Sequence, residues 1–296
     1  MKCLLWRQHR GQLAWTGLVI AAAGVAMTVV ARSADQWLAT YARWLAQLRA
    51  TGCPLPTSGT SVVHAPPPIC HTLLSRYSGG EQSSFAHAYN YAIPVLEEGL
   101  PLLMVVIGVL IGAPLVAREV EQRTQLVAWT QSVPRGRWYV IKAAVLASGL
   151  ALAGLVAGLG NHRAEVPLTQ GGLTSSRWIW FYSIDLAPAA DAVLAFALAV
   201  AMGACLRRTV PSIGAALVGF LVLFLFSGWV VRHLTPASES TGPRGAPDNG
   251  WSIGSGRYHP AHQYWSLQIT YLAILLVLAL ILLVLGWLAT RPRRVV

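Results

Sequence analysis

The sequence predicts an all-α, polytopic membrane protein with six transmembrane helices. Of its 296 residues, 55% are hydrophobic and only 11% are charged, and the mean hydropathy is +0.53. Soluble domains carry about 25% charged residues, so this composition argues against a soluble domain. A helix needs roughly 20 apolar residues to cross a hydrocarbon core about 30 Å thick. Six stretches approach or exceed that length, and they cover residues 13–31, 99–117, 143–160, 186–206, 211–231 and 267–290.

The first apolar stretch, 13–31, contains no Asp, Glu, Lys or Arg. Arg7 and Arg10 precede it, as basic residues precede the apolar core of a cleavable signal peptide. The stretch is longer than a usual signal-peptide core, and five more apolar stretches follow it. We therefore expect it to remain in the protein as a transmembrane helix.

The second, fifth and sixth stretches are also free of charged residues. The third is slightly short and rich in glycine, and we expect Gly149, Gly154 and Gly158 to let neighbouring helices approach closely. The fourth is long enough to span only if it includes Asp191. We expect Asp191 at or just below the outer interface, where its carboxylate either complements the helix dipole or lines a transport pathway.

The basic residues predict that both ends of the chain are cytoplasmic. In this N-in/C-in orientation, the short cytoplasmic segments hold 13 of the 22 lysines and arginines. Basic residues in short segments resist translocation, whereas long loops cross largely regardless of charge. The net charge of +11 is scattered in twos and threes beside apolar runs, which favours membrane lipids over nucleic acid as partners.

The first outer segment, 32–98, is predicted to contain a helix and a disulfide. Apolar and aromatic residues recur at helical spacing from Trp37 to Leu48, which predicts an amphipathic helix. Cys53 and Cys70 both lie on the outer side, where an oxidising compartment would let them pair. Two free thiols are the alternative.

No catalytic, cofactor-binding or metal site is predicted. A phosphate-binding loop needs a Gly-Lys pair, but the two lysines, Lys2 and Lys142, do not follow glycine. The sequence also lacks the HExxH and GxSxG patterns, and the pair His259 and His262 is only a weak metal signal. Any ATP and Mg²⁺ are therefore expected on another chain.

The segment 118–142, between the second and third stretches, is not a plain linker. Leu126, Trp129 and Val133 share one helical face, and charged residues precede them. An amphipathic loop helix needs an apolar partner. The mixed charge before this one favours a protein groove over an anionic lipid surface.

Several motifs resemble those of the ABC-2 type exporter permeases of high-GC Gram-positive bacteria. They are Ala-Arg-Glu-Val-Glu at 117–121, Leu-Val-Ala-Trp-Thr-Gln-Ser-Val at 126–133 and Gly-Ala-Cys-Leu-Arg-Arg-Thr-Val-Pro at 203–211. Trp-Arg-Gln-His-Arg at 6–10 and the outer loop with two cysteines are similar too, so the resemblance extends over most of the chain. Arg123 stands where the family usually has glycine.

The resemblance implies a type V exporter-like permease fold in the plasma membrane of a bacterium. It also implies pairing with a second copy or a close relative, and binding of cytoplasmic ABC ATPase subunits to a coupling helix in the loop after the second span. Such a permease is not itself an enzyme. By matching position, the residues implied in coupling to the ATPase are Arg118, Glu119, Glu121, Arg123, Leu126, Trp129, Gln131 and Ser132.

A non-transporting membrane sensor or immunity-type scaffold is the alternative function. It would have the same spans but no ATPase partner. The sequence does not indicate the substrate of a transporter, so drugs, lipids, peptides and polysaccharides all stay open.

Overall fold

The computed structural model describes residues 98–121, 135–170, 181–234, 238–239, 251–254 and 257–290, together with residues 70 and 72 and scattered positions between 21 and 53. Five of the described helices are long and apolar enough to cross a membrane, as expected for a multi-pass membrane protein. These helices are α4 (Leu100–Glu121), α6 (Arg135–Gln170), α8 (Ala187–Leu206), α9 (Thr209–Leu234) and α10 (Tyr264–Ala289). The predicted first span, 13–31, lies mostly outside the described residues, so the count of six stays a prediction.

Four of the five helices begin and end within four residues of the apolar stretches, and α6 is the exception. The apolar stretch was 143–160, but the helix has 36 residues and extends beyond it at both ends. Hydropathy marks only the part of a helix that lipid surrounds. The candidate span of α6 covers Tyr139–Arg163, and the helix continues beyond it into more polar turns at both ends.

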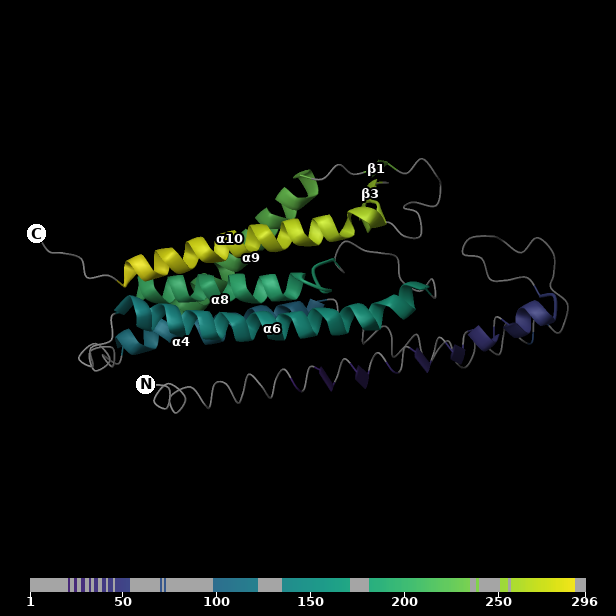
Figure 1. Cartoon of the computed structure of the whole chain (residues 1–296), viewed down its shortest axis with the longest axis horizontal. Helices are drawn as coiled ribbons and strands as arrows, with labels where there is room; N and C mark the ends of the chain where they lie inside the picture. Colours follow the sequence, from purple (N-terminus) through teal and green to yellow (C-terminus); the bar gives the residue numbers. More distant parts are fainter. Residues whose placement is uncertain are drawn as a thin grey trace, which may run out of the picture.

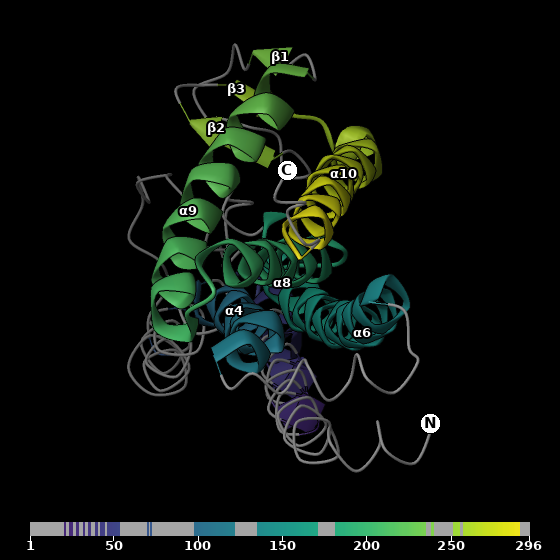
Figure 2. The same cartoon turned by 90° about the vertical axis from the view of Figure 1, so that its left-hand side faces the viewer.

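Helix α8 lies at the centre of the bundle and contacts α4, α6, α9 and α10 (Figures 1 and 2). Of its apolar window, 83% is buried inside the protein, compared with 22% for α9 and 17% for α10. The helix is rich in alanine, and small side chains let four neighbours approach it at once. Helix α8 is therefore the core element, whereas α9 and α10 keep broad apolar faces on the outside.

Glycines on α4 allow its close contact with α8. A β-carbon at Gly108 would lie 2.7 Å from the carbonyl oxygen of Ala192, and one at Gly112 would lie 2.6 Å from that of Phe196. Distances this short leave no room for a side chain. These two glycines therefore set how near the two helix backbones come.

Two of the three glycines singled out in the third stretch have the expected packing role, and they have it within the chain. A β-carbon at Gly154 would lie 2.5 Å from the Cα of Ala189, and one at Gly158 would lie 2.1 Å from the carbonyl oxygen of Asp185. Gly149 is different, because nothing lies within 4 Å of its β-carbon position. The first two positions fix α6 against the start of α8.

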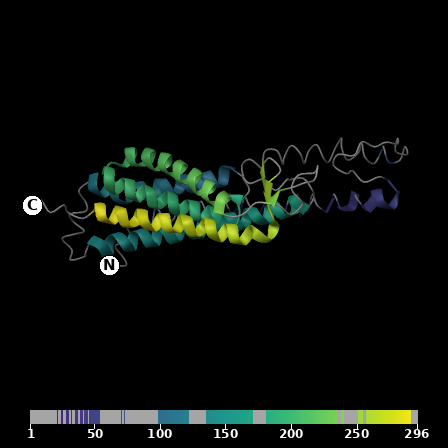
Figure 3. The same ribbon diagram turned by 90° about the horizontal axis from the view of Figure 1, so that it is seen from above.

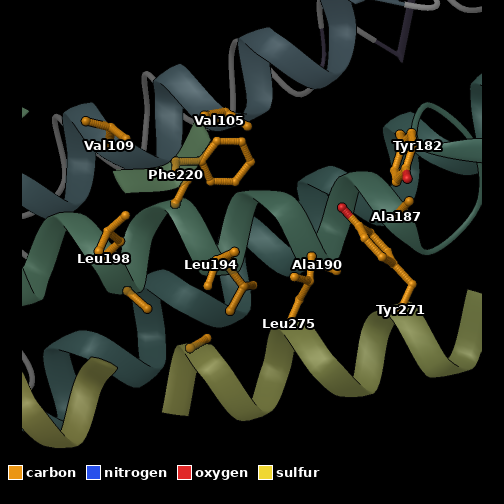
Figure 4. Close-up of a cluster of buried hydrophobic side chains, with 14 of the residues drawn as sticks. Val105, Val109, Tyr182, Ala187, Ala190, Leu194, Leu198, Phe220, Tyr271 and Leu275 are labelled. Atoms are coloured by element: carbon orange, nitrogen blue, oxygen red, sulfur yellow. The ribbon is translucent and has the colours of Figure 1, made fainter. Parts of the chain in front are cut away.

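Side chains from three neighbouring helices, together with those of α8 itself, form the main apolar cluster. Val105 and Val109 come from α4, Phe220 comes from α9, and Tyr271 and Leu275 come from α10. Figure 4 shows them converging on the central helix from different sides.

A small three-stranded sheet lies in the chain between α9 and α10. Its strands are β1 (Ser238–Glu239), β2 (Trp251–Gly254) and β3 (Arg257–His259), and β3 pairs antiparallel with both of the others. The sheet lies at the end of the bundle where α10 begins (Figure 3). The all-α prediction had no strands here, because strands of two to four residues leave no measurable alternation in the sequence.

The described part of the first outer segment contains the two predicted features, a helix and a disulfide that follows it. The described residues between 35 and 50 are helical, and Trp44 and Leu48 of the apolar face are buried. Cys53 and Cys70 are joined by a disulfide with an S–S distance of 2.05 Å. The structure therefore has the expected pair and not two free thiols at these positions.

Candidate functional site

Polar side chains gather at the two ends of the bundle. At one end, α4, α8 and α10 finish and α6 and α9 begin (Figure 1). Four arginines at this end are exposed, namely Arg118, Arg137, Arg207 and Arg208. All four belong to the segments that the basic-residue pattern predicts to be cytoplasmic.

The carboxylate of Glu121 links the last residue of α4 to the first residue of α9. Its Oε1 accepts a hydrogen bond from the backbone N–H of Thr209 at 2.9 Å, and its Oε2 accepts one from the Thr209 hydroxyl at 2.9 Å. Negative charge is favourable at a helix N-terminus, where backbone N–H groups lack partners within the helix. Glu121 therefore caps α9 from another helix.

The turn between α8 and α9 is only two residues long and is closed by further hydrogen bonds. Arg207 has a left-handed backbone with φ of 55°, and its N–H donates to the carbonyl oxygen of Gly203 at 3.1 Å. The hydroxyl of Ser212 donates to the carbonyl oxygen of Arg208 at 2.6 Å and lies 3.2 Å from that of Met202. The start of α9 is thus held by α8 through this turn and by α4 through Glu121.

The structure describes three of the eight predicted coupling residues, and all three lie in the last turn of α4. Arg118 is exposed, Glu121 is bonded to Thr209, and only the helical backbone of Glu119 is described. The remaining five lie outside the described residues, and they are Arg123, Leu126, Trp129, Gln131 and Ser132. Thr209 was not predicted as a partner of this segment, since no sequence pattern relates positions so far apart.

A second link near the same end joins α6 to α10. The hydroxyl of Tyr139 donates a hydrogen bond to the carbonyl oxygen of Leu283 at 2.9 Å. Gly286 makes room for this contact, because a β-carbon there would lie 2.7 Å from the tyrosine oxygen. A buried tyrosine hydroxyl usually finds a partner of this kind.

At the opposite end, buried side chains support the irregular segment that leads into α8. The amide of Asn161 on α6 donates to the carbonyl oxygen of Ser183 at 2.9 Å, and that of Gln268 on α10 donates to the carbonyl oxygen of Phe181 at 3.0 Å. Irregular backbone at membrane depth requires internal partners for its polar groups. These two amides supply partners to both carbonyls.

Asp185, at the last turn before α8, joins three elements. It has a positive φ of 53° and its carboxylate is buried. The hydroxyl of Tyr264 on α10 donates a hydrogen bond to this carboxylate, and Nδ1 of His162 on α6 lies 3.1 Å from the same oxygen. His162 is part-exposed, so its protonated form would supply the positive charge of an ion pair with a buried carboxylate.

Asp191 lies within α8, and 1% of its surface is exposed. The hydroxyl of Tyr271 on α10 donates a hydrogen bond to its Oδ1 at 2.7 Å. Figure 4 shows the tyrosine reaching from α10 towards the central helix. Asp191 is therefore enclosed by its own chain, and the structure adds a cross-helix partner to the two predicted roles.

Metal chemistry gains no support from the part of the chain that the structure describes. That part contains no group of three His, Cys, Asp or Glu side chains that could hold a metal ion. Nδ1 of the buried His259 lies 3.2 Å from Oε1 of Gln263, whereas His262 is exposed. The two histidines thus lie in different environments.

Comparison with known proteins gives one match. A family model described as ABC-2 membrane transporter related matches residues 68–232, which is more than half of the chain and includes α4, α6, α8 and most of α9. No curated protein and no solved structure matches the chain.

Proposed function

The chain belongs to the ABC-2 membrane transporter related family, and we propose that it is the permease subunit of an ATP-binding cassette exporter in a bacterial plasma membrane. Membership in this family supports a role as the membrane subunit of a transporter. In the proposal, substrate leaves the cell through this subunit, while a separate cytoplasmic subunit binds Mg²⁺ and ATP and hydrolyses the nucleotide.

The distribution of charge supports the proposed N-in/C-in orientation. The four exposed arginines lie at one end of the bundle, where the predicted coupling loop leaves α4 and returns to α6. A cluster of arginines at the cytoplasmic ends of the spans follows the positive-inside rule. The disulfide then lies on the opposite, oxidising side.

The observation that carries the proposal is the link between Glu121 and Thr209. The last residue of α4 before the predicted coupling loop is bonded to the first residue of another membrane helix. A loop that docks on an ATPase needs such a connection if its movement is to reach the spans. In the proposal, residues 118–132 form the coupling segment.

A second copy of the chain, or a close relative, would complete the transport pathway. Among the described residues, the only aspartate inside a spanning helix is Asp191, and it is enclosed. The described bundle therefore offers little from which to build a polar conduit, whereas a two-fold interface between protomers creates one. The broad exposed apolar faces of α9 and α10 leave area for such a contact and for lipid.

Co-purification tests the proposal. The tagged full-length chain is isolated from its native membrane in mild detergent, its partners are identified by mass spectrometry, and ATPase activity is measured. We expect a P-loop ATPase in comparable amount. If the chain is recovered alone or with a protein that is not an ATPase, the exporter proposal is wrong and the sensor or scaffold function takes its place.

A loop variant makes the test specific. Replacing Leu126 and Trp129 with Asp removes the predicted apolar face, and we expect the ATPase to be lost from the complex. Ala128→Asp is the control, since it places a single Asp on the opposite face of the predicted helix. A double variant that still retains and stimulates its ATPase contradicts coupling through this loop.

A further inference from the structure

Glu121 belongs to the segment proposed to dock on the ATPase, but its carboxylate is already occupied. Both oxygens accept hydrogen bonds from Thr209, one from the backbone N–H and one from the hydroxyl. The two residues are 88 positions apart in the sequence. A carboxylate whose two oxygens are held in this way points at the start of α9.

The helix that Glu121 holds is less buried than α4 and α8, the two helices that connect to its start. In the apolar windows of the spans, 22% of α9 is buried, compared with 56% of α4 and 83% of α8. Val218, Val222 and Leu225 on α9 are all exposed. Helix α9 therefore has most of its surface outside the bundle, and one side of it packs on the core through Phe220, Phe224 and Val231.

Helices α4 and α8, in contrast, are locked together near the same end. A β-carbon at Gly203 of α8 would lie 2.7 Å from the carbonyl oxygen of Ala113 on α4, so the two backbones touch there. Because of this contact, α4 and α8 have little room to move relative to each other. Of the two connections to the start of α9, the turn at 207–208 comes from α8 and the Glu121 carboxylate comes from α4.

We infer that Glu121 is a positioning residue that transmits movement of the coupling loop to α9, and that it is not a contact with the ATPase. This inference rests on the proposed function, because it assumes an ATPase that moves the loop. When the end of α4 is displaced, the two bonds draw the start of α9 with it. The rest of α9, which keeps much of its surface outside the bundle, then tilts together with its start.

The chemistry of the link defines three informative variants. Glu121→Ala removes both acceptors. Glu121→Gln removes the charge but keeps an oxygen that can accept from the backbone N–H and an amide that can donate to the Thr209 hydroxyl. Thr209→Val removes only the hydroxyl bond. Val210→Ala is the matched control, because Val210 is the next residue and is 79% exposed.

The test measures ATPase binding and helix movement separately in the full complex. The thiols at Cys3 and Cys205 are first replaced by Ser, and spin labels are attached at Leu110 on α4 and Leu225 on α9, which are both exposed. Partner recovery, ATPase rate and the distance between the labels are recorded in lipid, without nucleotide and with ATP and vanadate. Coupling is measured as the fraction of molecules whose label-to-label distance changes when ATP and vanadate are added.

We expect Glu121→Ala to retain its ATPase partner but to reduce the ratio of shifted to unshifted molecules by roughly 2- to 30-fold, the usual range for a coupling residue. Thr209→Val acts in the same direction, the double variant adds little to Glu121→Ala, and Glu121→Gln and Val210→Ala stay near the wild type. An unchanged shift in Glu121→Ala overturns the inference. Loss of the ATPase from that variant also overturns it, because Glu121 is then a docking contact.

Failure of the proposed function gives a different result. If the wild-type chain recovers no ATPase, the exporter proposal falls and the inference falls with it. If the wild type recovers its ATPase and moves α9 while Glu121→Ala behaves identically, the exporter proposal stands and only the role of Glu121 is wrong.

Discussion

The hydroxyl of Tyr271 on α10 donates a hydrogen bond of 2.7 Å to the carboxylate of Asp191 on α8, and both side chains are buried. A carboxylate inside a membrane span is costly unless it has partners. This bond is the partner that the structure gives to Asp191, and it joins the central helix to the last helix of the chain.

Removing the donor of that bond should destabilise the protein. Tyr271→Phe keeps the ring but leaves the Asp191 oxygen unsatisfied, which costs about 1–3 kcal/mol. Asp191→Asn keeps an acceptor for the tyrosine and should cost less. Thermal unfolding in detergent measures both, and equal stability of Tyr271→Phe and the wild type contradicts the assigned role.

Two glycines of α6 should respond in opposite ways to the same substitution. Gly158→Ala places a methyl group 2.1 Å from the carbonyl oxygen of Asp185, and we expect a loss of about 1–3 kcal/mol or failure to fold. Gly149→Ala meets nothing within 4 Å, so alanine should be neutral or stabilising there. The unfolding temperatures of the two variants are compared. If both variants are equally tolerated, α6 does not contact the start of α8 as described.

The amides of Asn161 and Gln268, which donate to the segment that leads into α8, should not contribute independently to stability. Asn161→Leu and Gln268→Leu each leave a buried carbonyl without its side-chain donor, at a cost of about 1–3 kcal/mol. Both donors hold one short segment, so the double variant should lose less than the sum of the two single losses. A double-mutant cycle of unfolding free energies makes the comparison. Strict additivity would indicate that the two amides support independent structures.

Thiol labelling of intact cells should report the disulfide and the orientation together. A membrane-impermeant maleimide should not label the chain until a reductant opens the bond between Cys53 and Cys70. Cys205 is a free, exposed thiol at the end proposed to be cytoplasmic, and it should react only after permeabilisation. Cys53→Ser is the control, because it should free Cys70 for labelling without reductant. Labelling of Cys205 in intact cells reverses the orientation.

The elements that could be predicted from sequence are those that hydrophobic length alone decides. The apolar stretches locate α4, α8, α9 and α10 to within a few residues, because lipid imposes one requirement along the whole span. Hydropathy does not predict the polar ends of α6 or the short strands β1, β2 and β3. Neither feature depends on contact with hydrocarbon.

The candidate site was predicted only in part, because its contacts are tertiary. The motif before the coupling loop pointed to Glu121, but nothing in the sequence relates it to Thr209. His162 and Tyr264 are ordinary interfacial residues until the fold brings them to Asp185. Periodicity tells which face of a helix is apolar, whereas it does not tell which residue of another helix meets that face.

The enclosure of α8 has a consequence for biosynthesis. The ribosome makes α4 and α6 first, so α8 enters the bilayer beside two helices whose glycines fit its backbone. Helices α9 and α10 are made later and cover its remaining sides. A nascent chain that stops after Leu206 therefore presents the alanine-rich helix to lipid on the sides those helices cover, and quality-control proteases would meet it in that state.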